Sequence, residues 1–368
     1  MKLNYFVPIG LLLLSMCSMH AAVKRTIWST TCDGHRIDLY TLDDSRLHVQ
    51  LTNAGARIVS IQAPDRDGKR KDIVLGFNNA VPYLADPKAY FGATIGRYAN
   101  RLSKGTFVVE GRTYHVPLNN NGNAMHGGPK GFSTRVWKGK ILGRSSIEFT
   151  LTSPDGEMGF PGELKASVRY TLKGESLRID YTATTSRPTV LNLTNHTYFN
   201  LQGEASGDVL KEKLLLNADR YTPIDGSLIP TGEVAAVEGT PFDFRKMTPI
   251  GQRINDSNDQ LRNAGGYDHN FVLNGRSGEM HKAAFASDPV SGRTLTVLTT
   301  EPGVQFYSGN FLNGSVNGYT GKPYGKYAGF CLETQHFPDS PNHANFPSTT
   351  LLPGKTYRST TVFIFGVN

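Results

Sequence analysis

Four polar or charged side chains lie within or beside segments that are otherwise typical of buried β-strands. They are His196, Asp268, Gln305 and Glu333. A charged group in an apolar strand costs free energy unless it is paired or has a function. One such group would be a hydrogen-bonded edge residue. Several of them predict a shared polar cleft on the concave face of a sheet.

The types of these side chains indicate what such a cleft would bind. A carboxylate, an imidazole, amides and nearby aromatic rings suit a sugar, because polar groups bind hydroxyls and rings stack on its apolar face. A carboxylate and an imidazole can also hold opposite protonation states near neutral pH. His269 would point to the opposite face of a strand from Asp268, so we do not include it.

The elements that would position these residues are strands joined by turns. Residues 106–116 form two β-rich runs about a Glu-Gly pair, which predicts a hairpin. Residues 168–181 repeat the pattern, and their alternation places Val168, Tyr170 and Leu172 on one face. Helical periodicity is scarce, with a turn or two of helix expected at 82–90.

Two further segments define the expected sheets. Residues 49–61 contain Gly55, where we expect a bend or a bulge. Residues 360–365 (TTVFIF) predict a final strand. Turn sequences occur throughout, and no linker or fixed-period repeat interrupts them. The chain is therefore predicted to be one all-β body, a sandwich or a barrel.

Length and composition bound the class of protein. The chain has 368 residues, of which 19% are charged and 38% hydrophobic, so it is too apolar for a disordered chain and long enough to bury a large core. The formal net charge of +8 is a modest excess. The densest basic run, 69–71, has acidic neighbours and predicts a solvated hairpin tip. We expect no nucleic-acid partner.

The first 22 residues are typical of a secretory signal peptide. Lys2 precedes an apolar run at 6–16 and then small residues, and the run is too short for a comfortable membrane span. We expect residues 23–368 to be one exported domain, periplasmic or secreted, with no membrane span after the leader is removed. Lipid attachment at Cys17 and a retained anchor are the alternatives.

Cysteine, histidine and motif usage narrow the chemistry further. Cys32 and Cys331 would remain after export, either paired in an oxidising compartment or as two free buried thiols. Nucleotide-binding, serine-hydrolase and HExxH or paired CxxC zinc motifs are absent from the sequence. His336 and His343 lie in a Pro-rich stretch that predicts a surface loop. We expect no metal and no cofactor.

Ordered sequence blocks from about residue 30 to the end resemble the aldose 1-epimerase family, also called galactose mutarotases. The blocks occur in the order that is typical of the family. The blocks are FGATIGRYANR (91–101), NAMHGG (123–128), LTNHTYFNL (193–201), YTPID (221–225) with PTGE (230–233), YDHNF (267–271), PGVQFYSGN (302–310) and CLETQHFPD (331–339).

The resemblance implies a fold, an activity and residue roles. The fold would be a large single-domain antiparallel β-supersandwich, and the activity would interconvert the α and β anomers of free aldoses without a cofactor. Glu333 would be the general base at the anomeric hydroxyl and His196 the general acid at the ring oxygen. The implied sugar-binding residues are Asn100, Arg101, His126, Asp268 and Gln305.

Rival functions remain open on the sequence. A sandwich that only binds carbohydrate would need neither an acid nor a base. A glycoside hydrolase could use Asp268 and Glu333 as its paired carboxylates. A sugar-phosphate epimerase would need clustered basic residues, for which Arg97 beside Arg101 is a weak hint. The expected partner is a monosaccharide, and the expected state is a monomer, with a dimer as the alternative.

Overall fold

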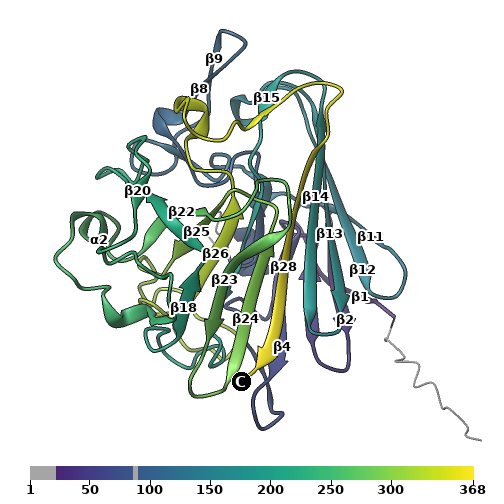
Figure 1. The fold of residues 1–368 in the computed structure, drawn as a ribbon. Coiled ribbons are helices and arrows are strands. Elements are labelled where there is room, and N and C mark those ends of the chain that lie inside the picture. The colour runs from purple at the N-terminus through teal and green to yellow at the C-terminus, as the bar shows by residue number, and fades with distance from the viewer. Residues whose placement is uncertain (1–21, 86–89) are drawn as a thin grey trace, which may run out of the picture.

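Antiparallel strands dominate the computed structural model, which describes residues 22–85 and 90–368 (Figure 1). The longest strands form a nine-stranded sheet, in which neighbouring strands are antiparallel. In spatial order its strands are β11 (Lys138–Ile141), β12 (Ser146–Ser153), β13 (Leu164–Lys173), β14 (Ser176–Thr185), β28 (Tyr357–Val367), β24 (Arg293–Thr299), β23 (His281–Ser287), β18 (Lys213–Leu216) and β21 (Thr248–Pro249).

A six-stranded antiparallel sheet forms the second layer. Its strands are β17 (Tyr198–Phe199), β26 (Phe330–Gln335), β25 (Gly303–Tyr307), β22 (Asp268–Leu273), β19 (Ala218–Thr222) and β20 (Ala235–Ala236). One face of this sheet carries large apolar side chains toward the nine-stranded sheet. The ring of Phe199 on β17, for example, lies 5.2 Å from that of Phe363 on β28.

The N-terminal segment forms a third sheet of five strands. Its strands are β1 (Lys24–Thr30), β2 (Arg36–Asp43), β3 (His48–Thr52), β4 (Arg57–Pro64) and β5 (Arg70–Asp72). Four strand pairs lie outside the large sheets: β6 (Ala93–Ile95) with β16 (Thr194–His196), β7 (Arg101–Leu102) with β10 (Ala124–Met125), β8 (Thr106–Val109) with β9 (Arg112–His115), and β15 (Thr189–Val190) with β27 (Thr350–Leu351).

Helices are few and short in the described part of the chain. They comprise α1 (Val81–Ala85), α2 (Asp259–Ala264) and the 3₁₀ turns η1 (Ser103–Gly105), η2 (Phe132–Thr134), η3 (Glu157–Gly159), η4 (Ile250–Gln252) and η5 (Ser340–Asn342). Among residues 22–85 and 90–368, no helix is long and apolar enough to cross a membrane. The all-β sandwich predicted from the sequence is confirmed.

One continuous core fills the space between the layers. It includes Val168 and Ile179 of the nine-stranded sheet together with Phe306 and Leu332 of the six-stranded sheet, all at most 2% exposed. Alternate residues of β13 are buried, as the period of two in its sequence predicts. This packing makes the six-stranded sheet a rigid support for whatever its other face carries.

Most local predictions are confirmed, with two corrections. The hairpins at 106–116 and 168–181 and the final strand are present. The bend expected at Gly55 is a full chain reversal, because β3 and β4 pair with each other on either side of it. A β-carbon at Gly55 would lie 2.5 Å from the Ser133 carbonyl oxygen, so only glycine fits this turn.

The cysteines give the second correction. The sequence left open a disulfide or two buried free thiols. Cys32 and Cys331 are both free thiols in the structure, and Cys331 is buried but Cys32 is exposed. The predicted signal peptide lies almost wholly outside the described residues, as does part of the helical turn expected at 82–90. The described portion of that turn is the helix α1.

Candidate active site

Strand register brings three of the predicted site residues, Asp268, Gln305 and Glu333, to one face of the six-stranded sheet. Directly opposed residues of neighbouring strands point to the same face, and so do residues two apart on one strand. Two rows of side chains result. The first contains Asp268, Tyr307, Cys331 and Tyr198, and the second contains Asn270, Gln305 and Glu333.

The opposite face of the same strands belongs to the core. Phe306 and Leu332 lie there, and so does His269, which is fully buried. The His269 ring packs 4.5 Å from that of Phe242, at an angle of 65°. The alternation that separated His269 from the site in the sequence therefore holds in the structure.

His196 reaches this face from a different element, the short strand β16 that pairs with β6. Two tyrosine rings stack on its imidazole: Tyr90 at 5.6 Å with planes 20° apart, and Tyr198 at 4.9 Å with planes 19° apart. The His126 ring meets it edge-on at 5.2 Å. These aromatic contacts fix the plane of the imidazole.

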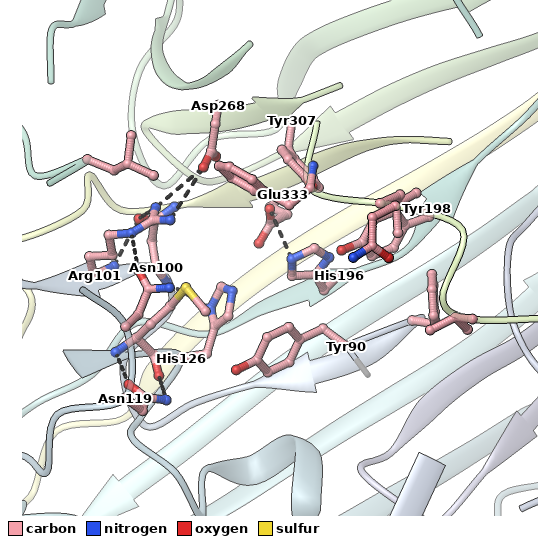
Figure 2. Close-up of a pocket in the computed structure, with 18 of the residues that line it drawn as sticks. Tyr90, Asn100, Arg101, Asn119, His126, His196, Tyr198, Asp268, Tyr307 and Glu333 are labelled. Carbon is pink, nitrogen blue, oxygen red and sulfur yellow. Dashed lines mark hydrogen bonds and ion pairs between the residues drawn. The ribbon is translucent and has the colours of Figure 1, made fainter. Parts of the chain in front are cut away.

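Glu333 faces His196, with Nε2 of the histidine 3.6 Å from Oε1 of the glutamate (Figure 2). Both side chains are almost fully buried, at 6% and 3% exposed. The other oxygen, Oε2, has no hydrogen-bond partner among the described residues. A buried carboxyl oxygen without a partner is costly, so this atom is well placed for a ligand hydroxyl.

Burial moves the two protonation equilibria in opposite directions. It raises the pKa of Glu333 well above its ordinary value, and the negative charge of Asp268 raises it further. Burial lowers the pKa of His196 to about 3; a hydrogen bond with its own main chain opposes this shift, and the cations Arg57 and Arg101 add to it. Without a ligand, both groups are therefore biased toward their uncharged forms.

His126 is locked in one tautomer by the main chain of Asn100. The main-chain N–H of Asn100 donates to Nδ1 of the His126 ring at 3.1 Å. The main-chain N–H of His126 donates back to the Asn100 carbonyl at 2.9 Å. Burial, followed by the neighbouring His196 and Arg101, lowers the pKa of His126 well below its usual value. The ring is neutral and carries its proton on Nε2, which makes it a hydrogen-bond donor.

The turn that presents His126 has strict steric requirements. His126 itself has a φ of 54°, and Gly127 follows with a φ of 84°. A β-carbon at Gly127 would lie 2.1 Å from the Gly96 carbonyl oxygen. Only glycine meets both the dihedral and the close approach here.

Asp268 is held by two partners on the other side of the pocket. The Gln305 amide donates to its Oδ1 at 2.7 Å. The Arg101 guanidinium lies 3.5 Å from its Oδ2 (Figure 2). Arg101 also donates to Asn120 at 3.1 Å and contacts the Asn100 side chain. This network holds the Asp268 carboxylate in place at the wall of the cavity.

The side chains enclose a cavity of about 400 Å³. Six of the seven predicted site residues line it: Asn100, Arg101, His126, His196, Asp268 and Glu333. Gln305 does not line the cavity, because it lies behind Asp268 with its amide engaged there. Its predicted role as a sugar ligand stays a prediction.

Several lining residues were not selected from the sequence. Tyr307 and Tyr198 each lie two residues from a selected one, so the period of two could have found them. Tyr90, Asn119 and Phe311 reach the cavity from loops that no strand pattern marks. Their placement depends on the tertiary fold.

His126, His196 and Glu333 offer metal-ligating atoms that all lie within 4.8 Å of one another. The tautomer of His126 opposes a metal there. A cation on Nε2 would force the ring proton onto Nδ1, which already accepts from the Asn100 N–H. The site is therefore better suited to oxygen-bearing ligands that accept a hydrogen bond.

The geometry also bears on two of the rival functions. An imidazole rather than a second carboxyl lies opposite Glu333, which argues against a paired-carboxylate hydrolase. The Arg97 guanidinium is buried and donates to main-chain carbonyls of the 153–162 loop. It is thus engaged in holding that loop rather than available to a phosphate.

Comparisons with known proteins assign the chain to a family. A family model described as aldose 1-epimerase matches residues 38–363. The chain belongs to the aldose 1-epimerase family. Galactose mutarotase from Homo sapiens is 45% identical over 348 residues, covering 94% of this chain and 99% of the relative.

More distant members agree in sequence and in fold. Aldose 1-epimerase from Escherichia coli is 39% identical over 337 residues, covering 90% of this chain and 96% of the relative. The crystal structure of a galactose 1-epimerase from Lactobacillus acidophilus superimposes with a TM-score of 0.82 at 29% identity, covering 95% of this chain and 99% of that one. The chain is thus an isomerase of the mutarotase class that interconverts anomers.

Proposed function

We propose that this chain interconverts the α and β anomers of free aldoses such as galactose and glucose by opening and reclosing the sugar ring. The observation that carries the proposal is the pairing of Glu333 and His196 at the buried end of the cavity, 3.6 Å apart. The Oε2 atom of Glu333 is the acceptor left open for a sugar hydroxyl. The name of the human relative supports galactose as one substrate.

Each residue of the pair handles one proton of the hemiacetal. Glu333 takes the proton of the anomeric hydroxyl, while His196 gives a proton to the ring oxygen and the C1–O5 bond breaks. Rotation about C1–C2 exposes the other face of the aldehyde. Reclosure forms the C1–O5 bond again, returns the ring-oxygen proton to His196 and gives the Glu333 proton to O1. A positioned acid or base contributes ~10²–10⁴-fold each.

The opposite pKa shifts are compatible with these roles. A protonated Glu333 beside a neutral His196 carries the same number of protons as a carboxylate beside an imidazolium. The sugar hydroxyls that hydrogen-bond to Glu333 favour its charged form. Binding therefore moves one proton within the pair and requires no exchange with solvent.

The other lining residues orient the sugar. Asp268 and Arg101 present an acceptor and donors on one side, and His126 presents its Nε2–H on the other. Tyr90, Tyr198 and Tyr307 supply ring faces and edges for the apolar surface of the sugar. This division between hydroxyl partners and aromatic rings fits a monosaccharide.

We also propose that the protein is exported and acts as a monomer after residues 1–22 are removed, with residues 23–368 as its one domain. Support for export comes from the leader pattern of the sequence alone. N-terminal sequencing of the protein recovered outside the cytoplasm tests this. An intact Met1 on a cytoplasmic product would overturn export, and light scattering measures the mass of the particle.

Polarimetry of freshly dissolved α-D-galactose and α-D-glucose tests the activity, with Glu333→Gln as the matched variant. We expect the wild type to accelerate mutarotation and the variant to lose ~10²-fold or more in kcat. Glutamine keeps the size and hydrogen-bonding capacity but cannot accept the proton. A folded wild type that accelerates neither sugar would favour a binding-only sandwich instead.

A further inference from the structure

A thiol lies behind the proposed acid. The sulfur of Cys331 is 3.5 Å from Nδ1 of His196, on the side of the imidazole remote from Glu333. Cys331 is fully buried and precedes Glu333 by two residues on β26. The strand alternation therefore delivers the thiol and the carboxyl to the same face, one at each ring nitrogen.

The protons that the reaction moves decide whether Nδ1 is the donor or the acceptor in its contact with the thiol. In the proposed cycle Nε2 alternately carries and lacks a proton. If Nδ1 were unprotonated, loss of the Nε2 proton would leave an imidazolate, which is far too basic to form near neutral pH. Nδ1 must therefore keep its own proton throughout, and a buried N–H needs an acceptor.

Sulfur is a particular kind of acceptor at this position. A thiol sulfur accepts a hydrogen bond weakly and carries no charge. Burial raises the pKa of Cys331 well above its ordinary value, and the nearby Glu333 and Asp268 raise it further. The group stays a neutral thiol. It can orient Nδ1–H without stabilising the imidazolium as a carboxylate would.

We propose that Cys331 is a positioning residue whose thiol sulfur accepts the Nδ1 proton of His196 and thereby keeps Nε2 directed at Glu333 and the sugar ring oxygen. The stacking tyrosines fix the plane of the ring, and the thiol fixes which nitrogen is permanently protonated. The catalytic consequence rests on the proposed function, whereas the tautomer can be measured independently of it.

The tautomer is measured by nitrogen NMR on protein labelled with ¹⁵N-histidine, at a pH where His196 is neutral. A His196→Gln variant assigns the signals. We expect a protonated Nδ1 and an unprotonated Nε2 in the wild type. In Cys331→Ala we expect the signals to move toward the Nε2–H form that free imidazole side chains favour, and in Cys331→Ser we expect the wild-type pattern.

Kinetics provide the second readout. Cys331→Ala should lower kcat about tenfold with KM nearly unchanged, which corresponds to the loss of one hydrogen bond. Cys331→Ser supplies a neutral acceptor at the same place and should recover most of that loss. Cys32→Ser, at the exposed cysteine, is the matched control and should change neither kcat nor the spectrum.

The outcomes separate the possibilities. An Nε2–H tautomer in the wild type overturns the proposal, as does a Cys331→Ala protein with wild-type tautomer and kcat. A loss of stability with the wild-type tautomer retained would mean that Cys331 only fills space, which also overturns it. A wild type without any mutarotase activity would refute the proposed function, while the spectra would still decide the Nδ1 assignment.

Discussion

Two imidazoles next to β26, one buried and one partly buried, have different partners. His196 packs beside the strand with a thiol at Nδ1 and has a lowered pKa. His336 directly follows the strand, and its Nδ1 lies 2.6 Å from Oε2 of Glu301, a carboxylate that also accepts from the Tyr357 hydroxyl at 3.0 Å. The His336 ring is 20% exposed, so the expected surface loop is in fact anchored to the core.

The two environments show that the partner, more than the depth of burial, sets the charge of an imidazole. Burial alone would lower the pKa of His336, but the charge and hydrogen bond of Glu301 outweigh it and raise that pKa. At His196 the carboxyl of Glu333 is 3.6 Å from Nε2, too far for a good hydrogen bond, and burial prevails. One site holds a fixed charge pair, and the other holds a proton that can move.

The largest expected effect contrasts the two histidines directly. His196→Asn should lower kcat by ~10²–10⁴-fold, because it removes the proposed acid. His336→Asn should leave kcat of the folded protein nearly unchanged, because His336 does not line the cavity. Polarimetry on both variants measures this, and an equal loss in both would abolish the distinction.

Breaking the structural pair should cost stability instead of activity. Glu301→Gln removes a buried carboxylate partner of His336, a change typically worth ~3–5 kcal/mol of unfolding free energy. Glu333→Gln should cost far less, since one oxygen of Glu333 has no partner among the described residues. Urea unfolding compares the two, and a greater loss in Glu333→Gln would contradict the assignment.

The pH dependence of stability should have opposite signs at the two sites. The raised pKa of His336 adds stability that is complete below its ordinary value of 6.5 and is lost as the pH rises through the folded pKa. The lowered pKa of Glu301 adds stability above its ordinary value of 4.5, which is lost as the pH falls through the folded pKa. The pair contributes most between these values.

His196 behaves in the reverse way. Between pH 6.5 and about pH 3, His196 is protonated in the unfolded chain but neutral in the folded protein. The burial of His196 therefore lowers the free energy of unfolding increasingly as the pH falls through this range. Urea unfolding at several pH values should show the gap between wild type and Glu301→Gln widest near pH 5.5. The stability of His196→Asn relative to the wild type should instead increase as the pH falls. If the stability of either variant followed the same pH dependence as that of the wild type, the sign assigned to that site would be contradicted.

The smallest effect concerns Asp268, the second carboxylate of the pocket. Both of its oxygens have partners, whereas one oxygen of Glu333 has none among the described residues. Gln305→Leu removes the amide that donates to Asp268, so the carboxylate is less well placed for the sugar. We expect KM to rise about tenfold, with a smaller change in kcat, as befits one hydrogen bond to a charged group. A fall in kcat alone would place Gln305 in the chemistry rather than behind it.

Much of this architecture could be predicted because strands have a period of two. The buried face of β13 and the polar face that carries Asp268 and Glu333 both follow from that alternation. The same rule places Cys331 beside Glu333, although a small apolar residue in an apolar run gives no reason to select it. Polar residues were conspicuous in the sequence, and their apolar neighbours on the same face were not.

What could not be predicted depends on loops and on side-chain reach. Tyr90 enters the site from outside any strand, and the Asn100 main chain fixes the tautomer of His126 through a contact 26 residues away. Gln305 lies on the predicted face of the sheet, but its amide donates to Asp268 instead of pointing into the cavity. Such outcomes depend on distances of a few ångströms between segments that only the folded chain brings together.

The position of β28 has a consequence for how the chain is made. This last strand lies between β14 and β24, and it alone joins the two halves of the nine-stranded sheet (Figure 1). The other eight strands of this sheet all precede β28 in the chain and therefore leave the ribosome before it. The two halves of the sheet can therefore join only once β28 has emerged, and a nascent chain arrested before β28 would lack the strand on which both halves assemble.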